Sequence, residues 1–281
     1  METVASQPAV QALPPRTETW VQRASASGRY VRIGEWKSRF LPTARDLFIY
    51  LPEMHLREPD RALPLLLMHD GQNLFDGDLS YVHDSTWRVG ETADEEIAAG
   101  RVEPLIIVGV GNAGTERMAE YTPTPDTRLG GGRGPLYARL LVEEVLPLVA
   151  ARYPLLAGPG NTGIAGSSLG GLISLAIALR YPQRFGKVGV VSPSLWWDDQ
   201  AILKDVRSLP EHLPLRIWLD MGMAEGARHV HNTDVLAHLL EGRGWQADAD
   251  LLYRIYPDAV HNEDAWAARL PEILRFLFPA Q

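Results

Sequence analysis

A serine flanked by small residues stands where an apolar run changes into a helical pattern. The segment Gly166-Ser167-Ser168-Leu169-Gly170, followed by Gly171, joins TGIA to LISLAIALRYP. A G-x-S-x-G sequence between a strand and a helix is typical of a sharp turn that exposes its central serine, because small neighbours avoid a clash. A serine that only caps the helix is the alternative, and it fits Ser167. The central position favours Ser168 as a nucleophile.

A serine hydroxyl is a weak nucleophile at neutral pH and needs an adjacent base, usually a histidine held by a carboxylate. After such a turn, the acid and then the histidine follow on loops behind late strands. His261, in YPDAVHNEDAW after the run DLLYRIY, meets this requirement. Surface or packing roles are expected for the other histidines after the serine, which are His212, His229, His231 and His238. The HVH pair lacks a third ligand at a suitable spacing, so we predict no metal.

The acid is expected in the loop after the run LRIWL, which reads DMGMAEG over residues 220–226. Glu225 lies far enough into this loop to reach a histidine, whereas Asp220 ends the strand itself. We therefore predict Glu225 as the acid. Asp258, in the loop of His261, is the main alternative, and a serine–histidine pair without a strong acid is another.

Acyl transfer also needs backbone N–H groups aimed at the developing oxyanion. One comes from the residue after the nucleophile, here Leu169, and the other from a loop after an earlier strand. The turn His69-Asp70-Gly71-Gln72-Asn73 fits, and we predict Gln72 as the second donor. A simple turn is the alternative reading of DGQN. Asp70 is predicted to contact substrate.

The elements that must position these residues alternate along the chain. Short apolar runs cover residues 63–68, 104–110, 162–165, 187–191, 215–219 and 250–256, and helical patterns cover 87–99, 136–151, 169–181, 229–243 and 263–278. Residues 30–36 and 46–51 are typical of antiparallel opening strands. The alternation predicts an α/β protein with a mostly parallel sheet and helices on both faces. With the serine turn, this indicates an α/β-hydrolase fold. GGGRG at residues 130–134 predicts a mobile surface loop.

Composition narrows the range of functions. The 281 residues carry a formal net charge of -8 and no cluster of basic residues, so we expect no nucleic-acid partner. No cysteine is present, which excludes thiolate catalysis and disulfides. No apolar run is long enough for a membrane span, and METVASQPAVQALPPR lacks the features of an export signal, so a cytoplasmic location is expected. Residues 1–17 predict a flexible tail before a single catalytic domain over residues 18–281.

The chain from about Asp46 onward resembles an esterase family related to enterochelin esterase, feruloyl and acetylxylan esterases and the antigen 85 mycolyltransferases. The resemblance rests on HDGQNLFD, EYTP, NTGIAGSSLGGLISL, SPSLWWD, GMAEG and HNEDAW. It implies an α/β-hydrolase fold, with the nucleophile at Ser168, the histidine at His261, an acid at Glu225 and an oxyanion donor at Gln72. The basic residues with which siderophore esterases bind catecholates are not identifiable here, so no substrate is carried over.

Trp196 and Trp197 follow the strand after the nucleophile helix, where loops line a pocket at the carboxyl edge of the sheet. Aromatic walls suit an acyl or aryl group, and packing of the loop is the alternative for either ring. The leading interpretation is a serine carboxylic ester hydrolase that acts on a small-molecule ester without a cofactor. Acyl transfer to an alcohol, or a catalytically silent binding protein on the same fold, are alternatives. The sequence leaves the oligomeric state open.

Overall fold

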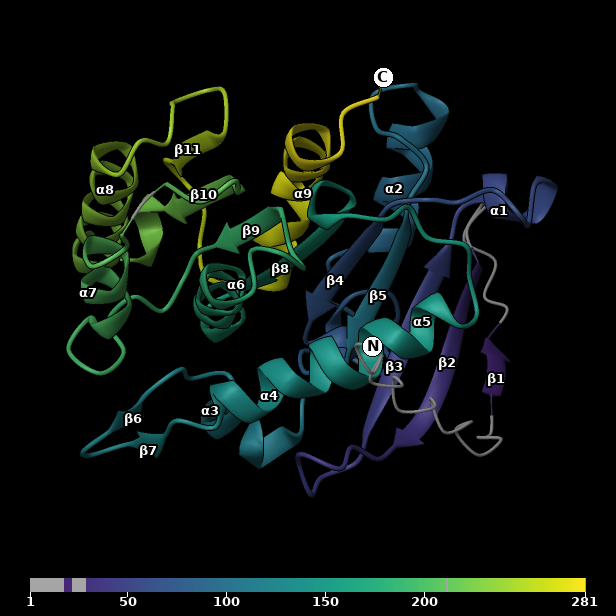
Figure 1. Cartoon of the computed structure of the whole chain (residues 1–281), viewed down its shortest axis with the longest axis horizontal. Helices are drawn as coiled ribbons and strands as arrows, with labels where there is room; N and C mark the ends of the chain where they lie inside the picture. Colours follow the sequence, from purple (N-terminus) through teal and green to yellow (C-terminus); the bar gives the residue numbers. More distant parts are fainter. Residues whose placement is uncertain (1–17, 22–28, 211, 281) are drawn as a thin grey trace, which may run out of the picture.

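The computed structural model describes residues 18–21, 29–210 and 212–280, so the predicted tail, residues 1–17, lies outside the described residues. Within them, one sheet has the strand order β1-β2-β3-β5-β4-β8-β9-β10-β11 (Figure 1). Its strands are β1 (Glu18–Val21), β2 (Arg29–Trp36), β3 (Arg45–Leu51), β4 (Leu65–His69), β5 (Ile106–Val110), β8 (Thr162–Ser167), β9 (Lys187–Val191), β10 (Arg216–Gly222) and β11 (Leu251–Tyr256).

The pairing confirms the predicted fold class. β1, β2 and β3 run antiparallel to their neighbours, and all pairs from β5 to β11 are parallel. Parallel strands require crossover connections, and these are supplied by helices. Consequently, the loops after β4, β8, β9, β10 and β11 all leave from the same edge of the sheet, where ligands of open α/β sheets bind.

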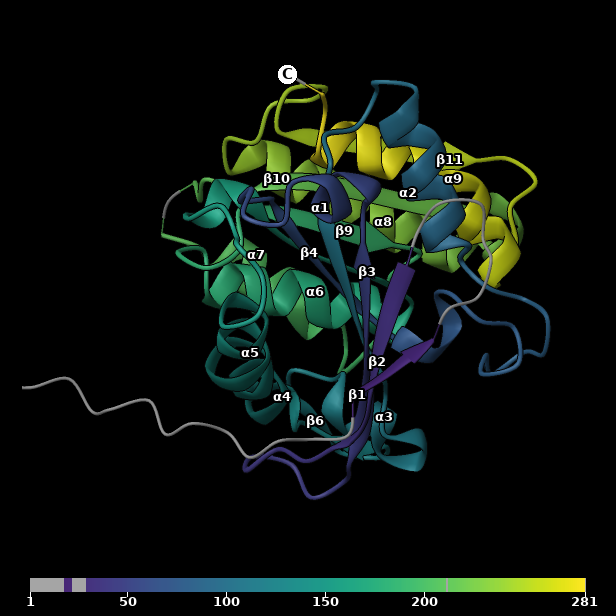
Figure 2. The ribbon, with the colours of Figure 1, turned by 90° about the vertical axis from the view of Figure 1, so that its right-hand side faces the viewer.

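Helices cover both faces of this sheet. They are α1 (Glu53–Arg57), α2 (Val89–Ala98), α3 (Arg117–Glu120), α4 (Gly134–Leu140), α5 (Leu146–Ala150), α6 (Leu169–Arg180), α7 (Ala201–Arg207), α8 (Ala227–Gly242) and α9 (Glu263–Leu277). Figure 2 shows α4, α5 and α6 on one side of the sheet, and α2 and α9 on the other.

The buried apolar residues form two clusters, one on each face of the sheet. Alternate residues of β4 divide between them, with Leu65 and Leu67 in one and Leu66 and Met68 in the other, as the two-residue period of a strand requires. A strand buried on both faces therefore explains the uninterrupted apolar run LPLLLM.

The helix predicted over residues 136–151 differs from expectation. A π-helical turn, η3 (Leu141–Val145), separates α4 from α5. Pro147 lies in the first turn of α5 and has no N–H for the residue four positions earlier. The widened turn is a local solution to this constraint.

The loop predicted at residues 130–134 contains a short strand and the start of a helix, and its mobility stays a prediction. Strand β7 (Gly130–Gly131) pairs with β6 (Pro125–Asp126) in a small hairpin, and Gly134 begins α4. Gly131 has φ +86°, and a Cβ atom there would lie 2.5 Å from Thr122 Oγ1 and 2.6 Å from Trp197 Cζ2. The glycines therefore serve backbone conformation and close packing.

These contacts predict unequal costs for two neighbouring glycines. Gly130→Ala should lower the free energy of unfolding by about 1–2 kcal/mol, because alanine is strained in the left-handed backbone conformation. No further loss is expected, since a Cβ there has nothing within 4 Å. Gly131→Ala adds overpacking against Thr122 and Trp197, which costs roughly 1–3 kcal/mol more. Urea denaturation of both variants measures the difference. Equal losses would contradict the proposed packing role.

Candidate active site

Ser168 joins β8 to α6 in a strained conformation, with φ 59° and ψ -124°. This region is sparsely populated by residues other than glycine and is maintained only when surrounding contacts enforce it. Ser168 N donates to Val191 O, and Ser194 N donates to Ser168 O, each at 3.0 Å. Gly166 is required because a Cβ atom there would lie 3.0 Å from the Gly170 carbonyl carbon. The turn therefore has the geometry of a nucleophile elbow.

His261 lies between β11 and α9, and Glu225 ends the short helix η5 (Met223–Glu225) after β10. His261 Nδ1 and Glu225 Oε2 are 2.6 Å apart, with side chains 45% and 2% exposed. Burial alone would raise the Glu225 pKa, but hydrogen bonds from His261 and Ser192 lower it overall. Glu225 is therefore a carboxylate at neutral pH. Its bond to Nδ1 leaves His261 Nε2 as the nitrogen that can accept a proton.

The two alternative acids occupy other environments. Asp220 is fully buried inside β10, where it accepts hydrogen bonds from Trp218 Nε1 at 2.7 Å and Arg269 Nη1 at 2.6 Å. Asp258 is exposed, and within the described part of the chain its carboxylate forms no hydrogen bond with His261. Of the three candidates, the structure brings Glu225 to the histidine.

The nucleophile hydroxyl has another hydroxyl beside it. Among the described residues, Ser168 Oγ forms its hydrogen bond with Ser194 Oγ, at 3.3 Å, rather than with His261. Catalytic hydrogen bonds are often long or misaligned before substrate binds. The structure thus places serine, histidine and acid on loops of one sheet edge without a closed serine–histidine bond.

The two predicted oxyanion donors lie on facing turns. Gln72 is in η1 (Gly71–Asn73) after β4, and Leu169 is the first residue of α6. A Cβ atom on Gly170 would be 3.5 Å from Asp70 Oδ2, so these turns are neighbours. Within the described residues, neither the Gln72 nor the Leu169 backbone N–H donates to a protein acceptor. Both can therefore donate to a ligand.

Asp70 precedes the η1 turn with φ 54°. Its carboxylate accepts hydrogen bonds from Arg117 Nε and Nη2 at 2.6 and 2.7 Å, and from Asn112 Nδ2 at 2.7 Å. Its backbone N–H donates to Tyr121 Oη at 3.1 Å. Burial would raise the Asp70 pKa, but Arg117 outweighs it and the net shift is downward. These contacts fix the turn that carries Gln72; the expected contact of Asp70 with substrate stays a prediction.

The two tryptophans differ in exposure. Trp197 is buried and donates from Nε1 to Thr124 O at 2.8 Å. Trp196 is half-buried, and its ring centroid lies 5.9 Å from that of Trp197. Trp197 therefore packs the loop after β9, and Trp196 is the tryptophan whose ring is partly accessible to a ligand.

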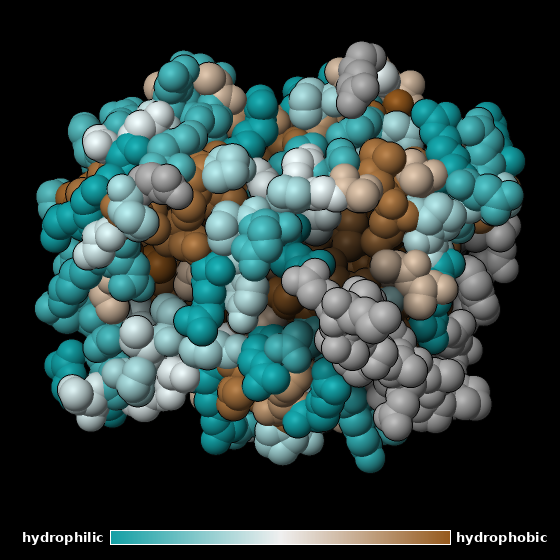
Figure 3. All heavy atoms as spheres, viewed as in Figure 1, coloured by the Kyte–Doolittle hydropathy of each residue, from teal (hydrophilic) through white to brown (hydrophobic). Residues whose placement is uncertain are grey.

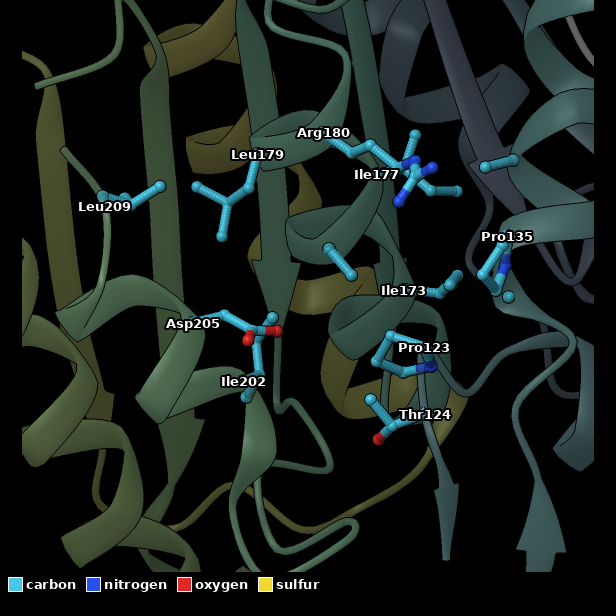
Figure 4. A pocket seen from close by; sticks show the side chains of 13 residues that line it. Pro123, Thr124, Pro135, Ile173, Ile177, Leu179, Arg180, Ile202, Asp205 and Leu209 are labelled. Carbon is cyan, nitrogen blue, oxygen red and sulfur yellow. The ribbon is translucent and has the colours of Figure 1, made fainter. Parts of the chain in front are cut away.

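An apolar pocket of about 330 Å³ lies beside α6, on the face where Figure 3 shows apolar side chains in a hollow (Figure 4). Its lining comes mainly from α4, α6 and α7, and includes Ile173, Ile177 and Ile202. Arg180 and Asp205 are its charged members. Neither Ser168 nor His261 contributes to it, so the pocket is separate from the candidate site.

One group of potential metal ligands occurs among the described residues, formed by Asp78, His83 and Asp84. All three are exposed, and His83 Nδ1 lies 2.9 Å from Asp84 Oδ2. Exposed acidic groups of this kind are common without an ion. We assign the group no role, and the absence of a metal stays a prediction.

Sequence reasoning gave no role to Ser192, Ser194, Trp266 or Arg269. Ser192 Oγ donates to Glu225 Oε1 at 2.6 Å and accepts from Arg269 Nη1 at 2.9 Å. Their position in the sequence could have indicated a role for the two serines. Ser192 and Ser194 lie in the segment SPS that directly follows β9, at the same edge of the sheet where Ser168 follows β8.

Strand order, elbow and histidine loop together define an α/β-hydrolase. Residues 38–277 match the model of a family described as "Putative esterase", so the chain belongs to this family and is an ester hydrolase by membership. No helix of the described residues is both long and apolar enough to cross a membrane.

The chain is similar to curated relatives, and solved structures share its fold. The chain is 27% identical over 247 residues to the uncharacterized protein YbbA of Bacillus subtilis, covering 83% of this chain and 92% of YbbA. It is 28% identical over 205 residues to the iron(III) salmochelin esterase of Escherichia coli, covering 67% of this chain but only 44% of that protein. A ferulic acid esterase structure has TM-score 0.68 and 17% identity, covering 90% and 98% of the chains. A Shigella flexneri enterobactin esterase structure has TM-score 0.69 and 22% identity, covering 92% and 61%.

The two tryptophans are expected to respond differently to truncation. Trp197→Ala removes a buried ring and should lower the free energy of unfolding by about 3–5 kcal/mol. Trp196→Ala should largely preserve stability but change the relative kcat/KM for aryl and alkyl esters. Thermal unfolding and a matched set of p-nitrophenyl esters measure both effects. Equal destabilisation by both variants, with unchanged substrate ranking, would assign Trp196 to packing.

Proposed function

We propose that the protein hydrolyses carboxylic esters of small molecules through an acyl-enzyme on Ser168. The observation that carries the proposal is the 2.6 Å bond between His261 and the buried Glu225. It supplies an oriented base at the sheet edge where the strained elbow presents Ser168. A serine becomes an effective nucleophile only with such a base.

In this mechanism, Ser168 Oγ exchanges Ser194 for His261 Nε2 as its hydrogen-bond partner and attacks the ester carbonyl carbon. The proton moves to Nε2, and Glu225 stabilises the imidazolium that forms. The backbone N–H groups of Leu169 and Gln72 donate to the oxyanion, with Leu169 at the positive end of the α6 dipole. His261 then protonates the departing alcohol, and water releases the acid by the same steps.

The proposed substrate class is a neutral small-molecule ester. Two relatives are named as esterases of iron(III) salmochelin and of iron(III) enterobactin. Here Arg117 is paired with Asp70, and Arg133 lies 2.5 Å from Glu116. Arg117, the first residue of α3, and Arg133, which precedes α4, are thus each paired with a carboxylate, and neither favours a polyanionic ligand.

Ser168→Ala is expected to abolish ester hydrolysis, with a loss on the order of a millionfold in kcat. Far-UV circular dichroism and the melting temperature should stay close to wild type, because only one oxygen atom is removed. A fluorophosphonate probe should label wild-type protein at Ser168 and leave this variant unlabelled. The control Ser208→Ala changes an exposed serine that directly follows α7 and should label normally. Substantial residual activity in the Ser168 variant would refute the assignment.

Glu225→Gln is expected to lower kcat by about four orders of magnitude, the typical cost of losing the orienting acid. Asp258→Asn is the matched control, because it neutralises a carboxylate in the loop that carries His261. It should retain nearly full activity. Steady-state kinetics with p-nitrophenyl acetate decide between them. The reverse order would move the acid to Asp258, and two near-normal variants would indicate a serine–histidine dyad.

A further inference from the structure

Ser192 directly follows β9 and has an unusual backbone conformation, with φ 41°. Its side chain is buried, and its Oγ has three polar neighbours: Glu225 Oε1 at 2.6 Å, Arg269 Nη1 at 2.9 Å and Trp266 Nε1 at 3.2 Å. Left-handed backbone outside glycine is costly and marks positions that surrounding contacts enforce. The strained turn sets this hydroxyl beside the carboxylate that holds His261.

The direction of each hydrogen bond follows from the groups involved. Arginine and tryptophan nitrogens can only donate, so Ser192 Oγ accepts from Arg269 and Trp266. The single hydroxyl proton is then left for Glu225, whose ionised carboxylate can only accept. The proton of Ser192 is thus directed at Oε1, while His261 binds the other oxygen of the same carboxylate.

Helix α9 supplies two further residues, Arg269 and Trp266, that contact Ser192. Arg269 is 2% exposed and also donates to Asp220 Oδ1 at 2.6 Å and to Glu225 Oε1 at 3.4 Å. Trp266, three residues earlier on the helix, packs edge-on against the His261 ring, with 4.9 Å between centroids. One serine therefore joins the helix that flanks the histidine to the acid that orients it.

We propose that Ser192 is a positioning residue for the proposed ester hydrolysis, acting through Glu225: its hydroxyl holds the carboxylate in the one orientation that aligns His261 with Ser168. Gly222 N, at the end of β10, donates to the same oxygen at 3.0 Å. Ser192 supplies the lateral contact from the neighbouring strand. The inference rests on the proposed function, since it assigns a role relative to Glu225.

Ser192→Ala is expected to lower kcat for p-nitrophenyl acetate by roughly 10- to 100-fold, as expected for one lost hydrogen bond to a charged group. KM should change less than about twofold, because Ser192 touches the acid and not the substrate. Ser192→Cys retains the shape with a weak donor and should fall between alanine and wild type. Ser208→Ala is the control for removing a serine hydroxyl elsewhere.

A double-mutant cycle separates positioning from a general structural role. In a Glu225→Gln background, Ser192→Ala should cost little further kcat, since the group it orients is already lost. The same factor in both backgrounds, or a normal kcat in both Ser192 variants while Glu225→Gln is impaired, would overturn the inference. Should the alanine variant fail to fold, the cysteine variant gives the same comparison. Failure of the proposed function is distinct, because wild-type protein would then resist fluorophosphonate labelling at Ser168.

Discussion

The buried ion pair between Asp220 and Arg269 is the contact on which the proposed site most depends. Asp220 belongs to β10 and Arg269 to α9, so the pair joins the strand before the acid loop to the helix after the histidine loop. Both side chains are nearly inaccessible to water, which makes separation of the charges costly. Burial raises the pKa of Asp220 even though Arg269 opposes that effect. The pair thus favours one relative placement of the two loops.

Backbone strain also occurs at the carboxyl edge of the sheet, where the candidate site lies. Ser168 and Ser192 both hold positive φ angles, and they are tied together through Val191 O and the backbone of Ser194. Neither conformation would persist in an isolated turn, since each costs on the order of 1–3 kcal/mol. The parallel pairing of β8 with β9 and β9 with β10 supplies the rigid frame that enforces them. The strained residues are therefore supported by interior strands of the sheet, each paired on both sides.

Local pattern was enough to predict the strands of the main sheet except β1, the antiparallel start and the α/β-hydrolase fold, because hydrophobic periodicity is a property of the chain itself. The elbow at Ser168 was also predictable, because the whole motif lies in one short segment, residues 166–171. The hairpin of β6 and β7 was missed because it depends on the packing of Gly131 against Thr122 and Trp197, contacts that only the folded chain reveals. The part played by Ser192 was hidden for the same reason, since Glu225 and Arg269 lie 33 and 77 residues away.

The proposed acid, Glu225, and the proposed base, His261, differ in burial. This difference explains why most of the hydrogen bonds that fix the pair are made to Glu225 rather than to His261. The His261 side chain is 45% exposed, so few protein atoms contact its ring. The orientation of the His261 ring is therefore set by its hydrogen bond to Glu225 and by its edge-to-face contact with Trp266. Glu225 is 2% exposed and can accept several fixed donors without obstructing the substrate. In this arrangement, the surrounding donors hold the buried Glu225 carboxylate in place, and the carboxylate holds the exposed His261 ring in place through one hydrogen bond.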